Sequence, residues 1–131
     1  MKNIKTLQFR EGAFPTSYQR FCYKIENGIM NLSANTQIDN ENDNIYRECK
    51  IDEKVYSLID DIIKDWNEEY SYKDVYPNIE ICDGFTWSLD IIYEDGTEKH
   101  SSGHEHYPDN FDDLIKCLND ALGIDVDLSF D

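Results

Sequence analysis

The stretch that decides the fold is residues 83–103, which read DGFTWSLDIIYEDGTEKHSSG. From Phe85 to Tyr93 every second residue is large and apolar, a period that places these side chains on one face of a β-strand. Asp95-Gly96 then gives a strong signal for a tight hairpin turn. The sequence therefore predicts an antiparallel hairpin whose return strand covers residues 97–103.

The length of that turn sets the register of the hairpin, and the register decides which face carries each polar residue. A two-residue turn at Asp95-Gly96 would place Tyr93 opposite Glu98 and Ile91 opposite His100. In that register His100 lies on the apolar face of the hairpin. We therefore expect His100 to pack beneath a helix.

Further antiparallel strands are predicted before this hairpin. Apolar and polar residues alternate over 19–25 and over 30–35, and Asn27-Gly28 between them is the strongest short hairpin signal. Weaker patterns indicate strands over 4–9, 45–51, 78–82 and 124–130, and a polar loop over 39–44.

Two amphipathic helices are predicted from apolar residues spaced three and four apart. Asp52 is placed to cap the first helix and Asp109 the second, where Asp112 follows three residues later. Gly123 is suited to end the second helix. The two apolar stripes are Val55, Leu58, Ile59, Ile62, Ile63 and Trp66, and then Phe111, Leu114, Ile115, Leu118 and Leu122.

The order of these elements predicts the fold class. Strands cluster first, and a helix, a hairpin and a second helix follow, which is typical of an α+β domain. We expect an antiparallel β-sheet with the two helices packed on one face, forming a single α+β domain over residues 1–131. That length is enough to bury a core without metal or disulfide staples.

The hairpin and the residues after it resemble a family of small uncharacterised bacterial α+β proteins. The shared pattern is D-G-x-[ST]-W-x-L-x-I-x-[YF]-x-D-G, matched by residues 83–96, followed by a Pro-x-Asn-Phe helix start, matched by residues 108–111. The resemblance covers roughly the last third of the chain. It implies a fold layout, no established activity, and no family-wide metal site at residues 104–106.

The charge of the chain narrows the classes of partner. Acidic residues outnumber basic ones 28 to 12, which gives a formal net charge of −16 at pH 7. Such a charge disfavours direct binding to nucleic acid or to anionic membranes and favours a basic protein partner. Because no secretory signal and no apolar run of membrane-spanning length is visible, the expected location is cytoplasmic.

The sequence favours a non-catalytic protein without a cofactor, since it contains neither a nucleophile elbow nor a phosphate-binding glycine loop. The four cysteines are at least 27 residues apart and are expected to remain reduced thiols. The identity of the partner, the oligomeric state and the host process stay open at this stage.

The leading hypothesis is an acidic protein-binding module, such as an immunity-type or anti-defence inhibitor of a basic, nucleic-acid-handling protein. Tyrosine is enriched at interfaces, and surrounding acids speed the encounter with a basic partner. The alternative is a tyrosine-rich loop that merely covers a helix edge. The predicted partner-binding residues are Glu68, Glu69, Tyr70, Tyr72, Asp74 and Tyr76.

A second hypothesis, from a different class, is a metal- or small-ligand-binding domain. His100, His104 and His106 alternate, so one strand would place all three on the same side. Imidazole groups gathered in this way could bind zinc or nickel. The alternative is that the three residues do not bind a metal, with one of them half-buried in the fold and the other two in a loop.

Overall fold

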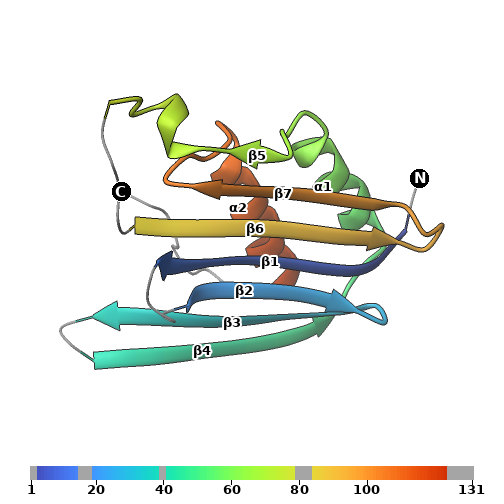
Figure 1. Cartoon of the computed structure of the whole chain (residues 1–131). Helices are drawn as coiled ribbons and strands as arrows, with labels where there is room; N and C mark the ends of the chain where they lie inside the picture. Colours follow the sequence, from blue (N-terminus) through green and yellow to red (C-terminus); the bar gives the residue numbers. More distant parts are fainter. Residues whose placement is uncertain (1–2, 15–18, 39–40, 79–83, 124–131) are drawn as a thin grey trace.

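The computed structural model describes residues 3–14, 19–38, 41–78 and 84–123 (Figure 1). One seven-stranded sheet in the order β4-β3-β2-β1-β6-β7-β5 forms the centre, and every pairing is antiparallel except that of β5 with β7. The elements are β1 (Ile4–Phe14), β2 (Gln19–Glu26), β3 (Ile29–Ile38), β4 (Glu41–Lys50), α1 (Lys54–Ile63), β5 (Glu69–Tyr70), the 3₁₀ helix η1 (Tyr72–Asp74), β6 (Gly84–Tyr93), β7 (Glu98–His104) and α2 (Phe111–Leu122).

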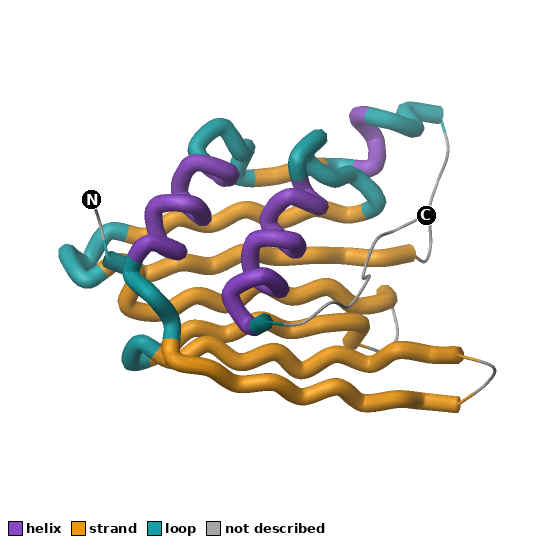
Figure 2. The backbone as a smooth tube through the Cα atoms, turned by 180° about the vertical axis from the view of Figure 1, so that it is seen from behind, coloured by secondary structure: helices purple, strands orange, loops and turns teal. Residues whose placement is uncertain are grey.

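Both helices lie on the same face of the sheet, as Figure 2 shows. The predicted α+β class, with an antiparallel sheet and two helices on one face, is therefore confirmed. Neither helix in the described ranges is long and apolar enough to cross a membrane. The predicted strands over 78–82 and 124–130 fall wholly or mainly outside the described residues.

The core lies between the helices and the sheet and is rich in aromatic rings. Phe111, the first residue of α2, packs edge-to-face on Phe9 of β1 and Trp87 of β6 at centroid distances of 5.3 and 5.2 Å. Trp66, which follows α1, stacks on Phe111 at 6.0 Å and meets Trp87 edge-on at 5.6 Å. These rings join both helices to the middle of the sheet.

The hairpin at residues 84–104 forms, but its predicted register is wrong by one residue. The turn contains three residues rather than two: Gly96 donates its backbone N–H to Tyr93 and adopts a left-handed φ of 88°. The carboxylate of Asp95 accepts hydrogen bonds from the N–H and hydroxyl of Thr97. His100 consequently pairs with Asp90 and faces away from the helices.

Two other local predictions also need correction. The polar stretch 39–44 is not all loop, because β4 begins at Glu41 and pairs along the whole of β3. The cap residue of α2 is Asn110 rather than Asp109. The Asn110 amide instead accepts from Trp66 Nε1 at 2.6 Å and donates to the carbonyl of Ile62 at 2.7 Å.

The cap residue of α1 is Glu53 rather than the predicted Asp52, whereas the prediction for the thiols agrees with the structure. The carboxylate of Asp52 accepts a hydrogen bond from the backbone N–H of Lys54 at the start of α1, at 3.0 Å. Cys22, Cys49 and Cys117 carry thiols rather than disulfides. Cys82 lies outside the described residues.

Gly103 is the residue of β7 at which a side chain is expected to be least tolerated. It lies directly opposite Trp87, whose Nε1 donates to the carbonyl of His106 at 2.8 Å. A Cβ at position 103 would collide with both the indole and that carbonyl. Gly103→Ala should therefore lower the free energy of unfolding by about 1–3 kcal/mol in urea denaturation. The neighbouring Ser102→Ala is the control, and an equal loss in both variants would contradict this account.

Candidate functional site

The candidate site lies on the face of the sheet that the helices leave uncovered. Along β6 the odd-numbered side chains of Trp87, Leu89 and Ile91 are buried against the helices. Since side chains alternate along a strand, Ser88 and Asp90 point to the opposite face. The register of the hairpin places polar residues of β7 beside them.

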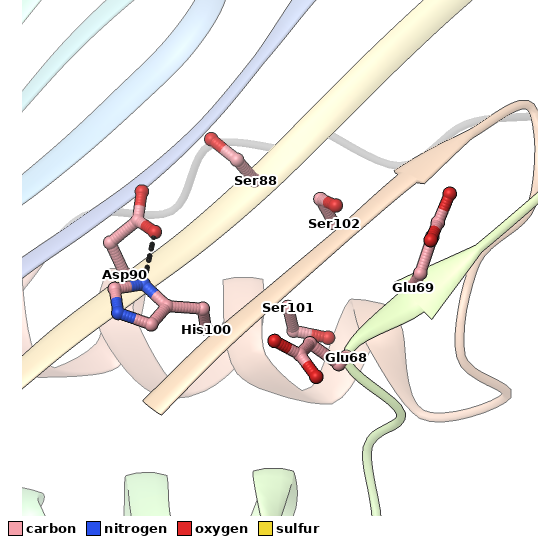
Figure 3. Close-up of a pocket in the computed structure, with 7 residues that line it drawn as sticks. All are labelled: Glu68, Glu69, Ser88, Asp90, His100, Ser101 and Ser102. Carbon is pink, nitrogen blue, oxygen red and sulfur yellow. Dashed lines mark hydrogen bonds and ion pairs between the residues drawn. The ribbon is translucent and has the colours of Figure 1, made fainter. Parts of the chain in front are cut away.

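A hollow of about 310 Å³ opens at this edge of the sheet (Figure 3). In Figure 3, the hydroxyls of Ser88 and Ser102 lie between Glu69 on one side and the Asp90–His100 pair on the other. The full lining consists of Glu68, Glu69, Ser88, Asp90, His100, Ser101 and Ser102.

The acidic wall of the hollow is held in place by the pairing of β5 with β7. Glu69 lies opposite Ser102, whose backbone N–H donates to the carbonyl of Glu68 at 3.0 Å. The hydroxyl of Ser101 donates to the carbonyl of Asn67 on the inner side of the edge. Both Glu68 and Glu69 are exposed, so their carboxylates are available to a partner.

His100 is held by two carboxylates. Its Nδ1 lies 2.7 Å from Asp90 Oδ1, and its Nε2 lies 3.1 Å from Glu98 Oε1. These contacts, the hydrogen bond to Asp90 first among them, raise the pKa of His100 above its usual 6.5. The side chains of His100 and Asp90 are 48% and 47% exposed, so solvent and a ligand can reach them.

Two further hollows adjoin the first across the open face. One, of about 310 Å³, shares Asp90 and His100 with it and extends over β1 and β2. The other, of about 360 Å³, shares Glu69 and Ser102 and extends to Tyr72 of η1. Because neighbouring hollows share lining residues, the three form a row from η1 across the open face to β2, which we call the trough.

Carboxylates outnumber cations around this trough. The guanidinium of Arg10 donates from Nε to Ser88 Oγ at 3.2 Å, and Lys24 lines the hollow over β2. Among the described residues, Arg10, Lys24 and the imidazole of His100 stand against five carboxylates, those of Glu26, Glu68, Glu69, Asp90 and Glu98.

The predicted partner-binding residues occupy different positions relative to the trough. Tyr70 is 9% exposed, packs on Trp87 and His106, and lines the hollow beside η1; its role as a contact residue stays a prediction. Its hydroxyl accepts a hydrogen bond from the N–H of Asn67 at 2.9 Å. Tyr70 is thus the apolar anchor that fixes β5 to the sheet.

The other five residues differ in position. Glu68 and Glu69 line the central hollow, and the half-buried Tyr72 lines the neighbouring one. The carboxylate of Asp74 accepts from the N–H of Ser71 in the capping box of η1, and Tyr76 is 42% exposed beyond it. Asp74 and Tyr76 lie outside the lining of the trough.

The structure does not gather His100, His104 and His106 into a metal site. Glu105 adopts a left-handed φ of 51° after β7 ends, which turns the chain away before His106. His104 meets the ring of Tyr72, and His106 Nδ1 lies 3.0 Å from the carbonyl of Ser71. Among the described residues, no group of three or more His, Cys, Asp or Glu side chains is arranged to hold a metal ion.

Sequence reasoning missed a second polar cluster, on the covered face of the sheet. Glu11 is 1% exposed and accepts a hydrogen bond from the Tyr107 hydroxyl at 3.0 Å, with Arg20 Nη1 at 3.4 Å. Its burial raises the pKa of Glu11 from 4.5 to about 7. Glu11 alternates with Leu7 and Phe9 along one strand, and this spacing could have predicted that Glu11 lies on their buried face.

Comparison with protein-family models, with curated proteins and with solved structures gives no match. The resemblance of residues 83–111 to small bacterial α+β proteins therefore stays a prediction.

Proposed function

We propose that this protein is a non-catalytic protein-binding domain that receives basic side chains of a partner in the acidic hollow at the β5–β7 edge. The observation that carries the proposal is the position of Glu68, Glu69 and Asp90 around one accessible hollow on an uncovered sheet face. Lysine and arginine are the side chains that match such a wall in charge, and arginine can bind a carboxylate through two parallel hydrogen bonds.

The net charge of −16 supports the same class of partner. A long-range negative potential speeds the encounter with a basic protein, and the hollow supplies a place where that encounter ends in specific contacts. Proteins that handle nucleic acid present such basic surfaces. Within this class, we propose an inhibitor of the immunity or anti-defence type, which covers the basic surface of its target.

The arrangement of His100 favours binding over catalysis. Both of its ring nitrogens are engaged by carboxylates, so neither is placed to take a proton from Ser88 or Ser102. A general base needs its accepting nitrogen within hydrogen-bond reach of the nucleophile.

A labelled nona-arginine peptide is a suitable probe, with binding followed by fluorescence anisotropy. We expect binding that weakens steeply as salt is raised, because the Debye length falls from about 30 Å at 0.01 M to about 8 Å at 0.15 M. Replacing both Glu68 and Glu69 with glutamine should weaken binding about five-fold at low salt, since two charges of the hollow are removed.

The matched control removes the same number of charges from the opposite side of the molecule. Asp61 of α1 and Asp120 of α2 are exposed, and Asp61→Asn with Asp120→Asn keeps the hollow intact. This control should bind the probe nearly as well as the wild type. Equal weakening in both double variants would show a response to total charge alone, and this result or an absence of binding would overturn the proposed site.

A further inference from the structure

We propose that His100 is a built-in competitor for the hollow: its imidazolium ring occupies Asp90, one of the carboxylates that a partner's basic side chain would use, and releases it as the pH rises. This inference rests on the proposed function and adds a regulatory device to it. It predicts that a cationic ligand binds more tightly at mildly alkaline than at mildly acidic pH.

The contacts of His100 carry the argument. The protonated ring of His100 is a planar cation whose two N–H groups each point to a carboxylate oxygen. The guanidinium of an incoming arginine would bind the same carboxylates in the same way. His100 also lines both the central hollow and the hollow over β2, so it lies where the two meet. Asp90 lines the same two hollows, so a basic side chain in either hollow would reach a carboxylate that the ring already contacts.

The charges around His100 come from every neighbouring strand. Asp90 on β6 and Glu98 on β7 contact the ring, Glu68 and Glu69 face it across the central hollow, and Lys24 and Glu26 of β2 face it across the other. Arg10 of β1 lies beside Ser88 on the floor. The surplus of acid favours the imidazolium, so His100 stays protonated to a higher pH than an isolated histidine.

The direction of the pH effect on cation binding follows from the charge of the His100 ring. Below the raised pKa of His100, the imidazolium neutralises part of the acidic wall and occupies Asp90. As the pH rises through that value, the ring becomes neutral and the hollow gains one net negative charge. A cation such as arginine, which stays protonated throughout this range, then binds with less competition.

The test is the affinity for the nona-arginine probe between about pH 5.5 and about pH 8.5, a range that begins below the usual pKa of histidine and extends above it. In the wild type the affinity should rise about five-fold over this range, the effect of one charge at close contact in a solvated site. His100→Gln should bind equally well across the range, with an affinity close to that of the wild type at the upper pH. His106 lies outside the lining of the three hollows, so His106→Gln should keep the rise.

A second measurement uses the reciprocity of linkage. If His100 and the probe compete, bound probe must lower the pKa of His100, which an NMR titration of its ring protons detects. Binding with no pH dependence, or with the same pH dependence in His100→Gln, would overturn the competitor and leave the proposed function intact. Absence of probe binding at every pH would overturn both.

Discussion

Phe111→Ala is expected to lower the free energy of unfolding by about 3–5 kcal/mol, the cost typical of removing a buried phenylalanine. Phe111 is 3% exposed and contacts four aromatic rings of the described residues, including that of Tyr107 at a centroid distance of 4.8 Å. Its loss leaves a cavity at the point where both helices meet the sheet, and α2 loses its first anchoring residue. Because domains of this size are stable by about 5–15 kcal/mol, the variant should lie near the threshold of folding.

Urea denaturation followed by circular dichroism measures this loss. Tyr76→Ala supplies the control, since it also removes an aromatic ring, but from a side chain that is 42% exposed. This control should change stability by no more than about 0.5 kcal/mol. Comparable losses in the two variants would show that the aromatic cluster does not hold the helices to the sheet.

Glu11→Gln should gain stability relative to the wild type as the pH rises. The difference between their free energies of unfolding should change by about 3 kcal/mol in total. The cause is the buried carboxyl of Glu11, whose pKa is raised from 4.5 to about 7 by burial despite the opposing effect of Arg20. Each unit of pKa difference between folded and unfolded protein corresponds to about 1.4 kcal/mol. Glutamine has nearly the same shape and does not titrate.

The direction follows from proton linkage. Below pH 4.5 Glu11 is protonated in both the folded and the unfolded chain, and its contribution to stability is fully present. Between pH 4.5 and about 7 the unfolded chain releases the proton first, so the wild type progressively loses that contribution. Above this window the buried carboxylate remains charged, and the advantage of Glu11→Gln is complete.

Urea denaturation of both proteins at several pH values gives the difference between their free energies of unfolding. The contributions of titrating groups that the two chains share cancel in this difference. Arg20→Gln is the converse test. It removes the cation that holds the pKa of Glu11 down, so the loss of stability with rising pH should become larger. A difference between Glu11→Gln and the wild type that stays constant with pH would contradict the assignment.

The main elements of the fold could be predicted because their buried side chains recur at the period of a strand or of a helix. The alternation from Phe85 to Tyr93 and the stripes of the two helices each require one buried face, and one sheet covered by two helices satisfies all of them. β5 carried no such signal, since it has two residues and depends on Tyr70 packing against Trp87.

The site was harder to predict from the sequence because it depends on the register of the β6–β7 hairpin. Glu68 and Glu69 stood out through their charge, but Asp90 and His100 come together only after a three-residue turn moves His100 to the open face. Asp-Gly is compatible with turns of both lengths. The choice rests on local hydrogen bonds of Asp95 to Thr97, which periodicity cannot reveal.

The contact between Trp66 and Trp87 has an experimental consequence. The chain contains two tryptophans, and their rings lie 5.6 Å apart at an angle of 76°. Tryptophan fluorescence, excited selectively from that of tyrosine, therefore reports on the aromatic cluster in which the end of α1 meets β6. Since neither tryptophan lies on β3 or β4, selectively excited tryptophan fluorescence does not directly report fraying of these two strands.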